Sequence, residues 1–412
     1  MLCEKLRNAV SKFVEEKHDY FIQWVFDEPI VASAGDRKEL GKVQNLMFRM
    51  ISGFVTEYLD KFQHVMPVTE KELRVIKAFD KKKIYRPGTY RTDFVFDSNR
   101  QIKLIEITCR FALNAIFENV VFNQYSIDYA CKTNLQDNRV EEYLGAIDYL
   151  ASLIADHKKV CILKGSDLKN SSRIFKGIFE DAGLQVIEVQ WQDCRKSHEL
   201  LSDSFVVSEL TLEEITNLDD STLSVLANCS LVNDFRTALL IHDKRFFSVL
   251  FDDGVLGEYL SQEEVMFFKP YLIPTYSYGQ SPKVWDQARG CKDGWILKHR
   301  ALGKSKSIYA GPVTDERKWS DLFDSHEIKD FILQQWVSQD RVSGHVGGVG
   351  YDDFITGTLM FFDEHYFGLG PFRTSSHPVT NVTDDRKAFP LVLEDPDQLD
   401  QNKYLLRLVR SS

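Results

Sequence analysis

The chain has 412 residues, of which 43% are hydrophobic, 12% aromatic and 27% charged, and its net charge at pH 7 is −10. This length predicts two or three domains with buried cores, and the composition excludes a largely disordered chain. The acidic balance argues against a nucleic-acid partner. Seven scattered cysteines without a C-x-x-C pair indicate reduced thiols rather than a disulfide framework or a zinc site.

The hydropathy pattern of the sequence gives no indication of a membrane partner. No apolar run reaches the 18 residues of a membrane span, and the first residues form an amphipathic pattern without the apolar core of a signal peptide. We therefore expect a cytoplasmic protein.

The first 85 residues are predicted to be helical. Apolar residues recur at helical spacing through residues 6–14 and 46–59, and a third helix is expected over residues 70–79. No chemical signature lies in this segment, so we interpret it as a supporting layer.

A β-hairpin is predicted next, because residues 90–96 and 101–108 alternate as strands around the turn 97–100. Alternation places Arg91 and Asp93 on one face of the first strand, and Glu106 and Thr108 on one face of the second. Paired strands would gather these side chains. They suit either a Mg²⁺ ion held by carboxylates and phosphate oxygens or a solvated ladder of ion pairs.

The middle of the chain reads as helices followed by a parallel α/β unit. Helices are expected over residues 115–121 and 140–154. A strand, a helix and a strand then follow over residues 158–189, with Gly183 as the helix C-cap. Further short strands are predicted at 205–207 and 230–232, then one helix running through His242 to residue 250. Gly165 alone does not make a dinucleotide-binding fingerprint, and His242 reads as structural.

A basic loop between two strands stands out in the last third of the chain. The strand 295–298 ends in Lys298 and Arg300, the loop carries Lys304 and Lys306, and a short strand leaves it near residue 308. Such a loop is either a solvated hairpin or a cover for a triphosphate.

The remaining pattern predicts further strands and a terminal helix. A strand is expected over residues 331–337, a hairpin over 354–368 and a helix over 399–409. The glycine-rich stretch 344–350 reads as a second mobile segment or a long turn.

Taken together and in order, these motifs resemble the ATP-grasp ligases, in particular the circularly permuted group that is similar to the synthetase half of glutathionylspermidine synthase. The resemblance covers about residues 86–395 and rests on Arg91-Thr92-Asp93, Glu106-Ile107-Thr108, Trp295-Ile296-Leu297-Lys298, Ile332-Leu333-Gln334, Phe372-Arg373-Thr374-Ser375 and Thr380-Asn381. In this group the carboxylate hairpin precedes the phosphate loop, as it does here.

The resemblance implies a mixed α/β (α+β) fold with an ATP-grasp domain. Its expected divisions are an N-terminal helical segment (1–85), the metal-binding hairpin and helices of the permuted ATP-grasp domain (86–155), a Rossmann-like pre-ATP-grasp domain (156–275), and the nucleotide-binding and lid portion (276–412). The amidase half of bifunctional relatives is not expected, because residues 1–85 carry no Cys–His pair of that type.

The implied activity is amide formation between a small-molecule carboxylic acid and an amine, including peptide or amino-acid derivatives, through an acyl phosphate made with ATP. Mg²⁺ is expected on Asp93, Glu106 and Thr108, and phosphate contacts on Lys298 and Arg300, with Lys304 and Lys306 on a closing lid. Adenine is expected beside the backbone of Gln334, Gln335 and Val337. Arg91 and Arg373 are expected to hold the transferred phosphoryl group or the acyl phosphate, with a structural salt bridge as the alternative for Arg373, and Arg110 is a further candidate for substrate carboxylate.

Two departures from the family pattern keep other functions open. Thr108 stands where the family usually has Asn, and the loop holds only Gly303 and Gly311. The alternatives are an ATP-grasp domain that binds nucleotide without turnover, and a phosphotransferase acting on an acceptor other than a carboxylate.

Overall fold

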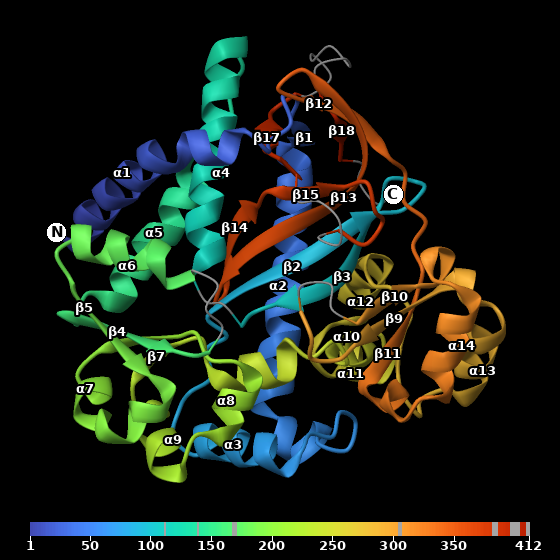
Figure 1. Cartoon of the computed structure of the whole chain (residues 1–412), viewed down its shortest axis with the longest axis horizontal. Helices are drawn as coiled ribbons and strands as arrows, with labels where there is room; N and C mark the ends of the chain where they lie inside the picture. Colours follow the sequence, from blue (N-terminus) through green and yellow to red (C-terminus); the bar gives the residue numbers. More distant parts are fainter. Residues whose placement is uncertain are drawn as a thin grey trace.

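The computed structural model of the chain describes residues 1–110, 113–137, 140–166, 171–303, 307–380, 386–395 and 404–408. Helices and strands are mixed throughout, as predicted. An antiparallel sheet crosses the centre of the molecule, with a parallel α/β unit on one side and a smaller lobe on the other (Figure 1).

The central sheet joins early and late parts of the chain. Its strand order is β16-β15-β13-β2-β3, with β12 and β14 also paired to β13. The strands are β2 (Thr89–Phe96), β3 (Ile102–Thr108), β12 (Val342–Val346), β13 (Val349–Phe362), β14 (His365–Leu369), β15 (Phe372–Ser375) and β16 (Arg386–Ala388). Both predicted hairpins are confirmed. The glycine-rich stretch is the β12–β13 hairpin, and its turn needs glycine because Gly347 and Gly348 both have positive φ.

The α/β unit forms a parallel sheet of order β5-β4-β6-β7. Its elements are β4 (Lys159–Lys164), α6 (Ser171–Asp181), β5 (Gln185–Gln190), α7 (His198–Ser202), β6 (Phe205–Ser208), α8 (Leu212–Asn217), α9 (Asp220–Leu226) and β7 (Ser230–Val232). The predicted strand–helix–strand and the two later strands are confirmed.

The helix predicted from the α/β unit through residue 250 is wrong, because the chain breaks in its middle. A π-helical turn spans Thr237–Ile241, residues 242–245 form turns, and α10 covers Phe246–Leu250. Two backbone N–H groups have other partners: that of Arg245 donates to the Asp243 side chain, and that of Lys244 donates to the carbonyl of Arg300. Both bonds compete with helical hydrogen bonding.

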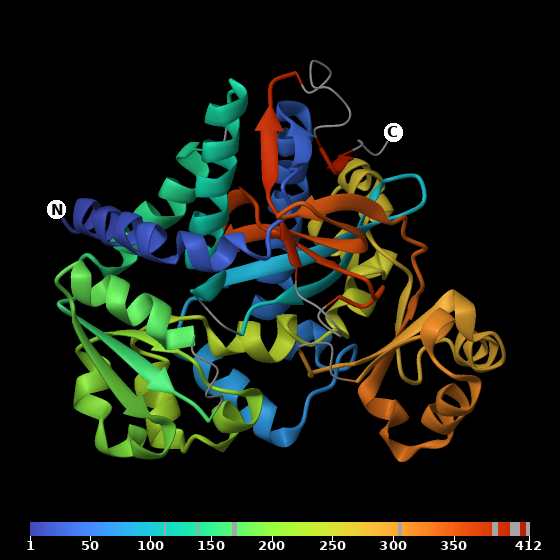
Figure 2. The same cartoon turned by 45° about the horizontal axis from the view of Figure 1, so that its top comes forward.

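The smaller lobe has its own sheet and its own core. Its strand order is β10-β9-β11-β8, all antiparallel. Helices α13 and α14 cover one face of it (Figure 2). The elements are β8 (Thr275–Ser277), α13 (Pro282–Gly290), β9 (Trp295–His299), β10 (Ile308–Ala310), α14 (Glu316–Asp324) and β11 (Phe331–Gln335). Strand β11 ends two residues before the predicted limit, where the N–H of Trp336 turns to the carbonyl of Gly294.

Further helices come from residues 2–154 and from residues 253–268. They are α1 (Leu2–Ile22), α2 (Ala34–Thr56), α3 (Glu70–Asp80), α4 (Asn114–Thr133), α5 (Val140–Ile154), α11 (Asp253–Tyr259) and α12 (Gln262–Phe268). The largest group of buried apolar side chains takes members from α2, α3, the central sheet and the α/β unit. Residues 1–85 therefore share a core with the later parts of the chain.

The N-terminal segment contains a strand that the periodicity did not predict. β1 (Ile30–Ser33) lies between β17 (Pro390–Leu393) and β18 (Leu406–Arg407), parallel to both. The predicted terminal helix is wrong over residues 404–408, where the N–H of Leu408 donates to the carbonyl of Val31. Four residues buried on both faces show no alternation, so only the pairing reveals this strand.

Two compositional expectations can be checked against the fold. All seven cysteines are free. None of the helices in the described ranges combines the length and the apolar character that crossing a membrane requires.

Candidate active site

A cavity of about 990 Å³ lies between the central sheet and the sheet of the smaller lobe. This volume is at the upper end of the range of small-molecule sites. The central sheet contributes Arg91, Glu106, Thr108, Thr358, Met360 and Arg373 to its wall, and the lobe contributes Ile296, Lys298, Ile308 and Gln334. Residues two apart along a strand share a face, so each sheet turns one face to the cavity. The other face of β9 carries Leu297, which packs in the core of the lobe.

The β2–β3 hairpin sets Asp93 and Glu106 directly opposite each other, and Arg91 opposite Thr108. Beyond this pair the register shifts, because Phe94 pairs with Leu104 and leaves Ile105 as an extra residue. An extra residue of this kind is a β-bulge, and its backbone groups are freed from the ladder. The carbonyl of Ile105 is thereby available to a side chain from the lobe.

That side chain is Lys298, which is 4% exposed although it carries an ammonium group. Its Nζ donates to the carbonyl of Ile105 at 3.2 Å and to Oε1 of Gln334 at 2.8 Å. Gln334 is oriented in turn by Thr275, whose Oγ1 accepts from Nε2 at 2.9 Å. Burial lowers the pKa of Lys298 to about 8, even though Glu106 opposes that shift. Gln334 thus positions the ammonium group of Lys298.

Glu106 lies between two buried ammonium groups. Nζ of Lys244 is 3.6 Å from Oε2 of Glu106, and Lys298 approaches from the lobe. Burial by itself would raise the pKa of Glu106, but the charges of Lys244 and Lys298 outweigh it and lower the pKa to about 2. Glu106 is therefore a carboxylate at any physiological pH, and it reaches the cavity.

Asp93 lies between two guanidinium groups. Nε of Arg91 donates to Oδ1 at 2.9 Å, and Nη2 of Arg373 donates to Oδ2. The Asp93 side chain is fully buried, whereas Arg91 and Arg373 both line the cavity. Each oxygen of Asp93 accepts from an arginine, so Asp93 holds two arginines at the cavity wall. The role of Asp93 as a metal ligand stays a prediction.

The chemistry of the donor groups tests whether magnesium fits here. Within the described ranges, no cluster of three or more His, Cys, Asp or Glu side chains is placed to hold a metal ion. Glu106 and Thr108 nevertheless offer the cavity one carboxylate and one hydroxyl group. Mg²⁺ is commonly bound by one or two carboxylates together with substrate phosphates and water. The residues therefore fit a magnesium ion shared with phosphate groups.

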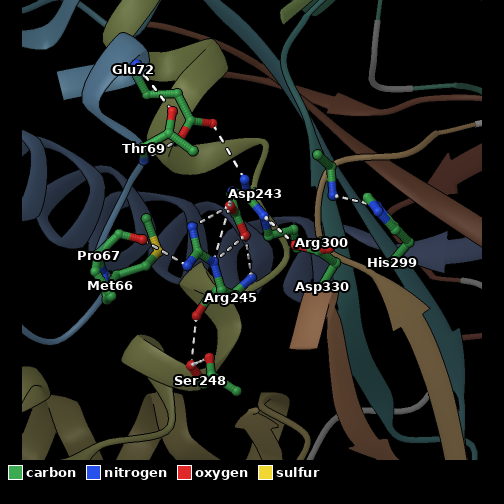
Figure 3. Close-up of polar contacts among 12 residues, drawn as sticks. Met66, Pro67, Thr69, Glu72, Asp243, Arg245, Ser248, His299, Arg300 and Asp330 are labelled. Atoms are coloured by element: carbon green, nitrogen blue, oxygen red, sulfur yellow. Dashed lines mark hydrogen bonds and ion pairs between the residues drawn. The ribbon is translucent and has the colours of Figure 1, made fainter. Parts of the chain in front are cut away.

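Arg300 belongs to a second ion cluster instead of the cavity wall (Figure 3). Its Nη1 donates to Oδ2 of Asp243 at 2.7 Å, and Glu72 and Asp330 lie 3.6 and 3.7 Å from its nitrogens. Asp243 also accepts from Arg245 through both carboxylate oxygens. The position of Arg300 gives no support to the predicted role in cofactor binding, since its charge is already neutralised.

The remaining predicted residues divide into two groups. Gln335 and Val337 line the cavity, although the N–H of Gln335 already donates to the carbonyl of Pro274. Lys304, Lys306 and Asn381 lie outside the described residues.

Two cavity residues were missed by sequence reasoning as functional candidates. His242 and Lys244 stand in the turn that interrupts the predicted helix, and both line the cavity. Nδ1 of His242 lies 3.3 Å from the carbonyl of Ile107, and burial lowers its pKa to about 4, so the ring is neutral at pH 7. In the predicted continuous helix these residues had no distinguishing pattern, and only the break reveals them.

Comparisons with known proteins do not establish an activity for this chain. A protein-family model described as the AnkG N-terminal domain matches residues 43–240, just under half of the chain. That range includes the β2–β3 hairpin but ends before Lys244, Lys298 and Arg373. No curated protein matches the sequence. Among solved structures, a presumed gamma-glutamylcysteine synthetase from Methylobacillus flagellatus KT is similar with a TM-score of 0.39 and 13% identity, covering 79% of this chain and 82% of that one. A likeness at that level carries no conclusion about fold or activity.

Proposed function

We propose that the chain is an ATP-dependent carboxylate–amine ligase whose site is the cavity between the two sheets. The observation that supports this most is the meeting of Lys298 with Glu106, which come from different sheets and lie almost two hundred residues apart. Around the Asp93–Glu106 pair stand the four cations Arg91, Lys244, Lys298 and Arg373. Among these six side chains the cations outnumber the carboxylates, which suits the phosphate groups of a nucleotide.

In this proposal the side chains divide the work of one reaction. The γ-phosphoryl group of ATP passes to a substrate carboxylate, which forms an acyl phosphate and ADP. An amine then attacks the acyl carbon and releases phosphate. Lys298 binds the phosphates of ATP, while Arg91 and Arg373, held by Asp93, stabilise charge on the transferred phosphoryl group and on the acyl phosphate.

Magnesium would be held by Glu106 and Thr108 together with phosphate oxygens. When bound, the ion neutralises charge that develops on the phosphate groups. The apolar wall of Ile273, Ile296 and Val337 is suited to the adenine ring.

Nucleotide binding without turnover is the second candidate. It is favoured by the pairing of both Asp93 oxygens with arginines, and by Thr108 where related ligases usually carry Asn. A phosphotransferase acting on another acceptor would use the same side chains, and it differs only in leaving a stable phosphorylated product.

One assay separates these candidates. Purified protein is incubated with ATP, Mg²⁺ and pooled amines and carboxylic acids, with and without each pool. Amine-dependent release of ADP and phosphate supports the ligase. Binding without ADP release supports the second candidate, and a stable phosphorylated product supports the phosphotransferase. Mass spectrometry of a metabolite extract, treated with and without ATP, then identifies the substrates.

Two substitutions test the site itself. Lys298→Ala and Glu106→Gln are each expected to abolish ADP formation while the fold is retained, as judged by circular dichroism. The matched control is Lys83→Ala, since Lys83 is also a partly buried lysine that donates to a backbone carbonyl, that of Cys229 at 3.0 Å, but it does not line the cavity. Unchanged turnover in either test variant would refute the assignment of the site.

A further inference from the structure

Asn233 is a buried side chain that joins the α/β unit to the open end of the β2–β3 hairpin. It follows the last residue of β7, is 4% exposed, and is not among the residues that line the cavity. Its amide lies between Thr89, the first residue of β2, and Cys109, the residue after β3. The turn 97–100 joins the two strands at one end of the hairpin, and Asn233 joins them at the other.

The side-chain amide of Asn233 makes every hydrogen bond that an amide can make. Oδ1 accepts from the N–H of Thr89 at 2.8 Å and from its hydroxyl group at 3.3 Å. Nδ2 donates to the carbonyls of Thr89 and Cys109, both at 2.6 Å. An amide has two acceptor lone pairs and two N–H donors, so all four are used. Because a backbone N–H can only donate, Thr89 also fixes which way round the amide lies.

This bridge stands beside two residues of the candidate site. The last pair of the β2–β3 ladder is Arg91 with Thr108, and both line the cavity. Beyond that pair, Asn233 supplies partners for backbone groups of Thr89 and Cys109, which are both buried. Buried backbone groups without a partner are costly, so the bridge holds both strands in place. Asn233 thereby sets the spacing of the strands next to the Arg91–Thr108 pair.

The surroundings of Asn233 hold it in this position. The neighbouring Asp234 is fully buried and accepts from Nη2 of Arg236 at 2.9 Å. The same nitrogen of Arg236 donates to the carbonyl of Lys83 at 2.9 Å. Gly88 has a φ of +78°, and a Cβ there would lie 2.2 Å from Oδ1 of Asn233. Only glycine leaves room for the amide at this point.

We propose that Asn233 is a positioning residue of the active site, which acts through Arg91 and Thr108 and does not reach the substrates itself. The inference rests on the proposed ligase function. Removing the amide leaves Lys298 in place to bind the nucleotide, but it shifts the side chains that serve the transferred phosphoryl group and the magnesium ion. A residue serving only the fold would change stability and leave the chemistry of the site as it is.

The experiment compares two variants of Asn233 with a control at a distance from the cavity. Asn233→Ala removes the whole bridge. Asn233→Asp keeps the size and the acceptor for the Thr89 N–H, but it sets a carboxylate oxygen against two carbonyls, and it serves as the test if the alanine variant does not fold. The control is Ser126→Ala, because Ser126 is fully buried and donates to the carbonyl of Pro390 at 2.6 Å but does not line the cavity.

Four quantities are measured on each folded protein. They are the free energy of unfolding in urea, the ATP affinity at saturating Mg²⁺, the Mg²⁺ concentration for half-maximal ATP binding, and the rate of ADP formation with pooled amines and carboxylic acids. Calorimetry gives the second and third. The Mg²⁺ requirement reports on the site without any turnover, so it separates a failure of this inference from a failure of the ligase proposal.

Both Asn233 variants are expected to keep an ATP affinity at saturating Mg²⁺ close to that of the wild type. Their Mg²⁺ requirement should rise about tenfold, as when the support of a metal ligand is lost. ADP formation should fall about 10- to 100-fold, the effect of a catalytic group misplaced by about 1 Å. Ser126→Ala should lose stability but keep the Mg²⁺ requirement and the rate of the wild type.

A folded Asn233 variant with an unchanged Mg²⁺ requirement and an unchanged rate overturns the inference but leaves the ligase proposal standing. Equal changes in Ser126→Ala indicate general destabilisation and also overturn it. So does an ATP affinity at saturating Mg²⁺ as low as that of Lys298→Ala, because Asn233 would then support the whole nucleotide site. If the wild type binds ATP but forms no ADP, the ligase proposal fails and the Mg²⁺ requirement decides the inference. A wild type that binds no ATP overturns both.

Discussion

Two ion clusters meet at the turn 242–245, and they differ in their charge balance. Around Asp243, the cations Arg245 and Arg300 face three carboxylates, those of Asp243, Glu72 and Asp330 (Figure 3). One residue further along the chain, Lys244 faces the cavity, where four cations surround two carboxylates. In the first cluster the carboxylates outnumber the cations, so it leaves no positive charge for an anionic ligand. In the second the cations outnumber the carboxylates, which is the balance that the proposed phosphate site requires.

The first prediction removes the centre of the cluster around Asp243. Asp243→Ala leaves two guanidinium groups without their shared partner, and breaking a buried pair in this way costs about 3–5 kcal/mol of the free energy of unfolding. Urea unfolding followed by circular dichroism measures the loss. Asp220→Ala is the control, because Asp220 is exposed and its pair with Arg74 should contribute about 0.5 kcal/mol or less.

The same variant tests the comparison itself. If the Asp243 cluster is structural, folded Asp243→Ala should still bind MgATP with an affinity close to that of the wild type. The contrary result is that Asp243→Ala loses little stability but binds MgATP as weakly as Lys298→Ala does. Asp243 would then be part of the binding site, and the two clusters would not differ in function.

The second prediction uses the lowered pKa of Lys298, which is about 8 instead of the ordinary 10.5. The protonated ammonium binds phosphate, so affinity for pyrophosphate should be level below pH 8 and should fall about tenfold per pH unit above it. Stability moves in the opposite direction. Between pH 8 and 10.5 the unfolded chain keeps the proton that the folded chain has lost, so the contribution of Lys298 to stability rises with pH.

Calorimetry between pH 7 and 9.5 measures the first effect and urea unfolding the second. Lys298→Met shows the effect of the other groups that titrate in this range. The remaining pH dependence, the difference between the wild type and this variant, is attributed to Lys298. If the difference in affinity between the wild type and Lys298→Met does not change between pH 7 and 9.5, Lys298 keeps its proton. The surroundings of Lys298 would then be more strongly anionic than proposed.

The smallest effect is expected at Thr108, which faces Arg91 across the hairpin and lines the cavity. Thr108→Asn introduces an amide carbonyl, an oxygen ligand that suits Mg²⁺ better than a hydroxyl group. The Mg²⁺ concentration for half-maximal ATP binding should fall about two- to fivefold. Thr358→Asn is the control, because Thr358 lies on the same face but on β13, which β2 separates from β3. A higher magnesium requirement in Thr108→Asn would place the ion elsewhere.

Local pattern was enough to predict the elements that carry most of the candidate site. Alternation and turn residues identified the β2–β3 hairpin, and with it the shared face of Arg91, Asp93, Glu106 and Thr108. The strand ending in Lys298 and the parallel α/β unit were likewise predictable, because strand period, helix period and glycine caps are properties of neighbouring residues.

Only the tertiary structure decided which of these groups meet and what each one does. The sequence by itself determined that Arg91, Asp93 and Glu106 share a face, but the other cations come from β9, β15 and the turn 242–245. Of these, Arg373 binds Asp93 beside Arg91, and the two lysines approach Glu106. Two further features also depend on the tertiary structure. They are the break in the predicted helix, which places Lys244 at the cavity, and the position of β1 between two C-terminal strands. Each depends on hydrogen bonds between residues far apart in the chain, which local periodicity does not encode.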